Sequence, residues 1–231
     1  MDKLNTESGN SFTLRRINAV AHSVRWLGAR AFLYHRINME GVEHLPRTGT
    51  ALILPKHRAY RDIVLEGVQL YKATTRLANY VMKAGLYSLL EAPGGIKIVR
   101  PKDVRKIKDR DKRRLLIREA REKNRKTLEY LAWLYRNDEL VISHPEGMRF
   151  QDDMGNLQKE IVEHALHVEQ SFGLRIPLIP IGLEYESFSR PFSRIDFRIG
   201  SPMYSGQYAD LPELMDAIDE RIRTLSGFEH E

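Results

Sequence analysis

The chain has 231 residues, of which 42% are hydrophobic and 29% are charged, a composition typical of a globular protein with a sizeable core. It contains no cysteine, which excludes disulfides, thiolate metal sites and cysteine nucleophiles. No apolar run approaches the roughly 20 residues that a membrane-spanning helix needs, and the first residues lack a secretory pattern. We therefore expect one globular domain with a terminal extension and no membrane-spanning helix.

The charge is unevenly distributed along the chain. Lysine and arginine number 37 against 31 aspartate and glutamate residues, a formal net charge of +6. Residues 100–126 hold 14 basic and five acidic residues, which gives this segment +9 and leaves about −3 for the remainder. This excess predicts an anionic partner, although a solvated helix face with intermixed acids is the simpler alternative.

An amphipathic helix is predicted near the N-terminus. Apolar or small residues recur with helical spacing at Leu14, Ile17, Ala21, Val24, Gly28 and Ala31. The opposite arc carries Arg15, Arg16, His22, Arg25, Trp26 and Arg30. Such a helix is suited to a lipid headgroup layer, or it packs its apolar stripe on the protein's own core, and the sequence leaves both open. We assign it to an N-terminal extension, residues 1–38, ahead of the main domain, residues 39–231.

The rest of the chain alternates between strand and helix patterns. Runs typical of β-strands occur at residues 51–54, 97–99, 140–143, 178–181 and 195–199. Helical patterns occur at residues 60–72, 79–91, 111–136, 157–172 and 211–225. This rhythm predicts an α/β fold, a single domain with a central mixed sheet flanked by helices.

A histidine and an aspartate, His57 and Asp62, follow the first of these apolar runs. On a continuous helix five positions leave two side chains roughly 140° apart, so the backbone must change course for them to meet. If His57 lies in the loop after the strand and Asp62 in the first turn of the next helix, the carboxylate reaches one imidazole nitrogen and the other is left as a base. A surface histidine beside an ordinary first-turn acid is the structural alternative.

Three further blocks lie at or beside predicted strands: residues 95–100 (GIKIVR), 144–149 (HPEGMR) and 176–181 (IPLIPI). Together with residues 56–62 (KHRAYRD), they stand in the order found in the glycerolipid acyltransferase family, which contains the bacterial 1-acylglycerol-3-phosphate acyltransferases. The chain resembles this family from about residue 41 to residue 202.

The match has a looser part and several departures. Residues 81–86, which include Lys83, resemble a lysine-containing segment that the family places between its first two blocks. Lys56 stands where asparagine is usual, Ala59 where serine is usual, His144 where an aromatic residue is usual, and Met148 where threonine is usual. These departures leave the subgroup, and hence the acceptor molecule, open.

The resemblance implies an acyltransferase in which His57 is the general base and Asp62 orients it. A hydroxyl is a poor nucleophile until a base with a pKa near 6.5 removes its proton, and Asp62 would stabilise the resulting imidazolium. The donor, acyl-CoA or acyl-carrier protein, is already activated as a thioester, so direct attack suffices and no cofactor is expected. Backbone N–H groups near His57 are candidates for holding the oxyanion.

Acceptor binding is assigned to Arg100 and Arg149, because guanidinium groups make bidentate, permanently charged contacts to phosphate. Lys83 joins them through the resemblance. Glu146 is expected either to accept a hydrogen bond from an acceptor hydroxyl or to hold Arg149, and Gly147 to let the turn run close to the substrate. The first candidate reaction converts lysophosphatidate to phosphatidate.

The predicted partners are therefore the acyl donor and anionic phospholipid, at the inner, cytoplasmic face of the cell membrane, and no nucleic acid. One alternative is a nucleic-acid-binding module built on residues 100–126, with stacking by Tyr130, Trp133 and Tyr135. Another is a non-catalytic protein that binds lipid headgroups. His164 and His167 lie three residues apart but lack a third ligand at motif spacing, so we expect no metal site.

Overall fold

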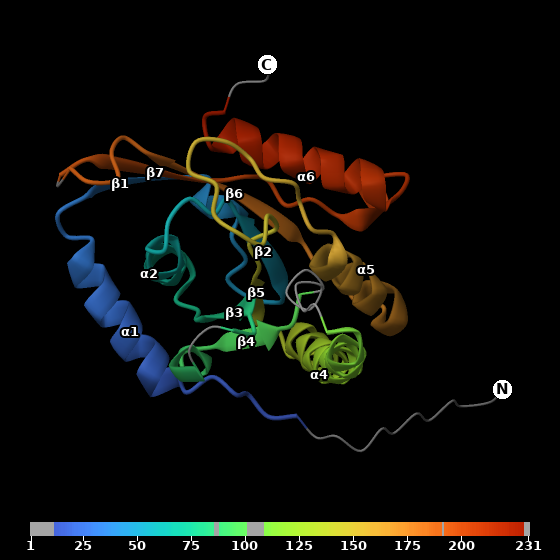
Figure 1. Ribbon diagram of the computed structural model, residues 1–231. Coiled ribbons are helices and arrows are strands. Elements are labelled where there is room, and N and C mark those ends of the chain that lie inside the picture. The colour runs from blue at the N-terminus through green and yellow to red at the C-terminus, as the bar shows by residue number, and fades with distance from the viewer. Residues whose placement is uncertain (1–11, 86–87, 101–108, 191, 229–231) are drawn as a thin grey trace.

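The structure, a computed structural model, describes residues 12–85, 88–100, 109–190 and 192–228 (Figure 1). Its centre is one seven-stranded sheet with the order β1-β7-β6-β2-β5-β3-β4. The strands are β1 Arg36–Glu40, β2 Ala51–Pro55, β3 Ala78–Lys83, β4 Gly95–Ile98, β5 Leu140–Ile142, β6 Leu178–Tyr185 and β7 Arg194–Ile199. Neighbouring strands are parallel except for the antiparallel pair β6 and β7. The predicted α/β fold with a central mixed sheet is confirmed.

Helices cover both faces of this sheet (Figure 1). They are α1 Asn18–Ala31, α2 Asp62–Thr74, α4 Arg110–Arg136, α5 Glu160–Phe172 and α6 Leu211–Leu225, with short 3-10 turns at Val42–His44, Ser88–Glu91 and Ser205–Gln207. β2 is buried along its whole length and alternates between the two cores. Leu52 and Leu54 pack with α4, α5 and α6, whereas Ala51 and Ile53 pack with α2. A strand that is apolar on both faces is typical of the centre of such a sheet.

The helix predicted at residues 79–91 is wrong. This segment forms β3 and, at Ser88–Glu91, a single 3-10 turn. β3 pairs with β5 on one side and β4 on the other, and the buried amide of Asn79 donates to Glu139 Oε2 at 3.0 Å and Leu140 O at 3.2 Å. Tertiary pairing therefore outweighs the helix propensity of the residues in this segment. The edge strand β1, with its alternating exposure, was not predicted either.

α1 packs on α2 with its small residues facing inward. Ala21 and Gly28 are buried, and Gly28 lies against Val64 and Val68 of α2. The large apolar side chains lie at the surface, with exposed fractions of 41–60%: Ile17, Val24, Trp26 and Leu27. The predicted stripe is thus split between the protein's own core and the solvent. The predicted basic arc is wrong in part, since Arg25 and His22 contact the ring of Tyr71 on α2.

The predicted boundary between the N-terminal extension and the main domain falls within a strand. β1 runs through residue 38, where the extension was expected to end, and that division stays a prediction.

The basic run at residues 100–126 is described only in part, because residues 101–108 lie outside the described residues. α4 continues past the end of the run into the core, where Tyr130 and Tyr135 are each 1% exposed and so are not available to stack on bases. Among the described helices, none is both long and apolar enough to cross a membrane.

Replacing Gly28 with valine should separate α1 from α2. A Cβ atom at this position would lie 2.3 Å from Val64 Cγ1, closer than real contacts allow. We expect Gly28→Val to lower the free energy of unfolding by about 1–3 kcal/mol, the usual cost of overpacking, in urea denaturation. Ala19→Val, at an exposed position of the same helix, is the control and should cost only the small helix-propensity difference. Equal effects of the two substitutions would contradict the packing described.

Candidate active site

The residues predicted to form the site follow the carboxyl ends of four parallel strands. His57 follows β2, Lys83 ends β3, Arg100 follows β4, and Glu146, Gly147 and Arg149 follow β5. Because β2, β5, β3 and β4 are neighbours and parallel, these ends share one edge of the sheet. Open α/β sheets bind their ligands at this edge.

His57 and Asp62 are in contact, with His57 Nδ1 3.1 Å from Asp62 Oδ2. The backbone changes course between β2 and α2, and Asp62 lies in the first turn of that helix. The same Oδ2 accepts hydrogen bonds from the amides of Arg58 and Ala59, both at 2.6 Å. An ionised Asp62 requires the proton of the neutral ring to sit on Nδ1, which leaves Nε2 as the proton acceptor. The arrangement is that of a base with an orienting carboxylate.

Asp62 has a further partner that the sequence did not indicate. The hydroxyl of Tyr185, the last residue of β6, donates to Asp62 Oδ1 at 2.6 Å. Burial alone would raise the pKa of Asp62, but the hydrogen bonds from His57, Tyr185 and the Ala59 amide outweigh it, so the pKa is lowered. Asp62 is therefore held as a carboxylate although its side chain is fully buried.

The imidazole of His57 is itself mostly buried, with 11% of the side chain exposed. Burial lowers the pKa of His57, and the hydrogen bond to Asp62 opposes this shift without cancelling it. At neutral pH the ring is accordingly unprotonated at one nitrogen, the state that a general base needs.

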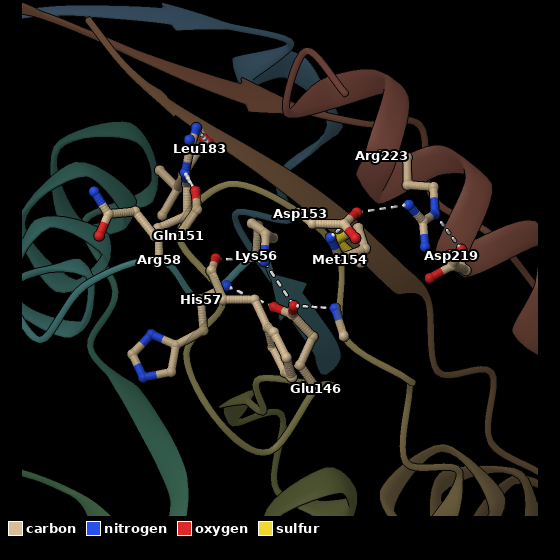
Figure 2. A network of polar contacts seen from close by, with 12 residues as sticks. Lys56, His57, Arg58, Glu146, Gln151, Asp153, Met154, Leu183, Asp219 and Arg223 are labelled. Carbon is tan, nitrogen blue, oxygen red and sulfur yellow. Dashed lines mark hydrogen bonds and ion pairs between the residues drawn. The ribbon is translucent and has the colours of Figure 1, made fainter. Parts of the chain in front are cut away.

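A buried ion pair fixes the backbone of His57 (Figure 2). Lys56 Nζ lies 2.6 Å from Glu146 Oε1, and both side chains are fully buried. Glu146 also accepts from the amide of His57 at 3.1 Å and from that of Gly155 at 2.9 Å. Figure 2 shows the imidazole of His57 directed away from this pair. The carboxylate of Glu146 thus has three protein donors, and its predicted contact with an acceptor hydroxyl stays a prediction.

These contacts also remove one candidate for the oxyanion site. The amides of His57, Arg58 and Ala59 all donate to carboxylates, the first to Glu146 and the other two to Asp62. Backbone N–H groups of these three residues are therefore already engaged. The expectation that amides beside His57 hold the oxyanion does not fit the structure at these positions.

The loop after β5 is tied back to the loop after β2 at several points. Lys56 Nζ donates to Phe150 O at 2.8 Å, the Phe150 amide donates to His57 O at 3.0 Å, and Arg58 Nε donates to Gln151 O at 2.6 Å. Farther along, Asp153 pairs with Arg223 of α6 at 3.2 Å (Figure 2). The two loops therefore form one hydrogen-bonded unit around His57.

Arg100 and Gly147 are brought together, since the Arg100 guanidinium donates to the carbonyl oxygen of Gly147. Gly147 has a φ of +64°, and a Cβ atom there would lie 2.4 Å from the side-chain amide nitrogen of Gln158. Only glycine suits this turn. Just before Arg100, the amide and carbonyl of Val99 are bound by the side chain of Asn124 on α4, at 2.9 and 2.8 Å. α4 thereby holds the strand end that carries Arg100.

Arg149 lies over an exposed aromatic ring. Its guanidinium carbon is 3.3 Å from the ring centroid of Tyr60, which is 74% exposed. Tyr60 belongs to the loop between His57 and Asp62, so the stack joins Arg149 to that loop. Lys83 is the last residue of β3 and is paired in register with Ile98 at the end of β4, on the same edge.

Sequence reasoning missed Lys56 and Tyr60 as members of the site, although both lie inside the first block. In the sequence, Lys56 stands out only as a departure from asparagine. Its burial beside Glu146 could not be inferred, because the two residues are 90 positions apart. Tyr185 and Asn124 carry no motif at all.

Comparisons with known proteins agree with this architecture. A family model described as Acyltransferase matches residues 36–184. The crystal structure of the 1-acyl-sn-glycerophosphate (LPA) acyltransferase PlsC from Thermotoga maritima matches with a TM-score of 0.57 and 17% sequence identity, over 93% of this chain and 82% of that chain. This likeness shows a shared fold. Among curated proteins, none matches the sequence.

Removing the ammonium group of Lys56 should destabilise the protein strongly. Lys56→Met leaves the carboxylate of Glu146 buried without its cation, which costs about 3–5 kcal/mol of unfolding free energy. The double variant Lys56→Met/Glu146→Gln removes the unpaired charge and should recover roughly half of that loss or more. Urea denaturation at pH 7 measures both.

The control is Lys97→Met, which breaks the pair of Lys97 with Glu91. This pair has the same N–O separation of 2.6 Å but side-chain exposures of 27% and 52%. Its loss should cost less than about 1 kcal/mol. If Lys56→Met were as mild as Lys97→Met, the buried pair would not hold the two loops together.

Proposed function

The chain belongs to the acyltransferase family, and on that premise we propose that it transfers a fatty acyl group from acyl-CoA or acyl-carrier protein to a hydroxyl of a glycerol-phosphate or lysophospholipid acceptor. Lysophosphatidate is the first acceptor to test. The observation that carries the proposal is the contact of His57 with the buried Asp62 at the carboxyl edge of the sheet. The fold shared with a 1-acyl-sn-glycerophosphate acyltransferase supports the choice of acceptor.

The proposed reaction is a direct transfer. His57 Nε2 removes the proton of the acceptor hydroxyl as its oxygen attacks the carbonyl carbon of the donor thioester. The tetrahedral intermediate then expels the thiolate, which takes the proton from His57, so the histidine returns to its starting state. Asp62 fixes the Nδ1–H tautomer and stabilises the transient imidazolium.

Arg100, Arg149 and Lys83 are the proposed binding groups for the phosphate of the acceptor. All three lie on the carboxyl edge, and the two arginines are held in place by neighbours, Arg100 by the carbonyl of Gly147 and Arg149 by the ring of Tyr60. A guanidinium group that is already oriented loses less side-chain entropy when it binds an anion. Glu146 and Gly147 shape the turn after β5, which contacts Arg100 and carries Arg149.

We also propose that the protein binds the surface of the cytoplasmic membrane. Large apolar side chains gather at the end of α1, in the segment that follows it and before β7: Trp26, Leu27, Leu33, Tyr34 and Phe192. They are 53–75% exposed, and we call them the apolar patch. Tyr34 and Phe192 contact each other edge to face, and the Arg30 guanidinium covers Trp26 at 3.3 Å. Exposed aromatic residues beside arginine suit an anionic lipid interface.

The aromatic residues named for the nucleic-acid alternative are buried or packed against one another. Tyr130 and Tyr135 are buried, and Trp133 packs against the Tyr130 ring. Several basic residues of α4 are paired locally, as Arg125 is with Glu122 and Glu129. That reading would also leave the His57–Asp62 contact without a role.

Replacing His57 with alanine should abolish acyl transfer while the fold is retained. The assay combines a labelled acyl donor with a panel of acceptors, including glycerol-3-phosphate, lysophosphatidate and other lysophospholipids. Loss of the general base should lower kcat/KM by about 10²–10⁴-fold. His167→Ala, at an exposed position of α5, is the matched control and should keep full activity. Undiminished transfer by the His57 variant would overturn the mechanism.

Replacing Trp26 and Leu27 together with serine should weaken membrane binding. Each side chain, if buried in lipid, contributes on the order of 1 kcal/mol or more, so the double variant should bind vesicles of anionic phospholipid at least about tenfold more weakly in a sedimentation assay. Leu115→Ser, which alters a similarly exposed leucine on α4, should bind as the unmodified protein does. Unchanged vesicle binding by the double variant would rule out the apolar patch as the lipid contact.

A further inference from the structure

A second histidine lies against the proposed base. The rings of His57 and His144 stack with their centroids 4.1 Å apart and an interplanar angle of 28°. His144 is the first residue of the block at residues 144–149, where the family has an aromatic residue. An aromatic ring there would supply the stacking contact but could not carry a charge. The histidine therefore adds an ionisable group directly against the face of His57.

His144 has its own buried carboxylate. Its Nε2 lies 3.0 Å from Oε1 of Glu66, which is fully buried on α2, one helical turn beyond Asp62. The other oxygen of Glu66 has no hydrogen-bond partner within the described part of the chain. A buried carboxylate is costly unless a positive charge or a proton accompanies it. Burial alone would lower the pKa of His144, but the attraction and hydrogen bond of Glu66 outweigh it, so this pKa is raised.

We infer that Glu66 and His144 form a second histidine–carboxylate couple, which positions the ring of His57 and keeps that ring in its neutral, proton-accepting form. The inference deepens the proposed function and, in its kinetic part, rests on it. An imidazolium at His144 repels a second positive charge on a ring stacked at 4.1 Å. The positive charge on His144 therefore lowers the proton affinity of His57 before the acceptor hydroxyl binds.

Other titratable groups around the two rings also act on them. Asp62 and Glu66 on α2 act on both rings, and Glu146 after β5 acts on His144. Lys56 after β2, Tyr80 on β3 and Tyr185 on β6 act on these carboxylates. Burial and the charge of His144 lower the pKa of His57, whereas Asp62 and Glu66 raise it, and the net direction is downward. The Asp62 hydrogen bond, at 3.1 Å, is the strongest of the opposing contributions, and burial together with the stacked His144 outweighs it.

The first test needs no catalysis. The ring protons of His57 are followed by NMR in protein labelled at histidine Cε1, with the signal assigned from the spectrum of His57→Ala. In the unmodified protein the midpoint of the His57 titration should lie below pH 6.5. His144→Phe keeps the stacked ring but removes the charge, and should raise this midpoint by about one pH unit. His22→Phe, which alters the histidine packed on Tyr71, is the matched control and should leave it unchanged.

A second variant guards against misfolding. His144→Phe alone leaves Glu66 buried without a cation, so His144→Phe/Glu66→Gln removes both charged partners while keeping a stacked ring at position 144 and the shape of the side chain at position 66. It should also raise the His57 midpoint, but by less than His144→Phe does, because the loss of Glu66 acts in the opposite direction to the loss of His144. A midpoint that stays within about 0.2 pH units of the original in both folded variants would overturn the inference. An unmoved midpoint would mean that the charge of His144 does not change the free energy of protonating His57.

The kinetic test follows kcat/KM against pH. Transfer requires unprotonated His57, so kcat/KM falls as the pH drops through the pKa of this residue, and the acid limb should move upward in His144→Phe by the same shift that NMR measures. A uniform fall in rate at every pH with an unmoved acid limb would show that the stack is structural only. If no acceptor supports transfer, the proposed function fails, and the NMR titration still decides on the couple by itself.

Discussion

The carboxylate of Asp62 is the constraint on which the site depends. Buried carboxylates stay ionised only when several donors surround them, and here the two amides after His57, the His57 ring and the hydroxyl of Tyr185 supply the hydrogen bonds. The position in the first turn of α2 adds the favourable end of the helix dipole. The loop from β2 to α2 and the end of β6 are therefore arranged around one carboxylate. This arrangement fixes the tautomer of His57 and leaves Nε2 as the acceptor.

The pair of Lys56 and Glu146 acts on the same histidine from its other side. Burying two charges costs so much desolvation that such a pair adds little net stability compared with well-packed apolar side chains. Its geometry has a different consequence, because Glu146 joins Lys56, the amide of His57 and the amide of Gly155 at one point. The backbone of His57 is held by Glu146 while its ring is held by Asp62. In this chain, the glutamate of the third block thereby holds the backbone of the proposed base directly.

The sequence predicts contacts that are local and fails for those that are distant. His57 and Asp62 could be joined because five residues span one change of course between a strand and a helix. Tyr185 is 123 positions from Asp62, and His144 is 78 from Glu66, so no periodicity links either pair. The same limit explains β3, whose residues also suit a helix and become a strand because β4 and β5 flank them. α6, whose boundaries were predicted correctly, is an amphipathic helix whose pattern is complete within itself.

The charge balance around the two stacked rings shows why only one of them should rest in the protonated state. Three carboxylates and one ammonium, all buried, surround the rings: Asp62, Glu66, Glu146 and Lys56. With both rings neutral this group would carry two uncompensated negative charges in a region of low polarity, and with one proton it carries one. In the inferred couple that proton rests on His144, next to Glu66, because Asp62 is already satisfied by amides and a hydroxyl. In the proposed transfer, the group becomes neutral overall when His57 takes the proton of the acceptor, so the transient imidazolium would be tolerated. Repulsion from His144 at 4.1 Å would then favour release of this proton to the departing thiolate.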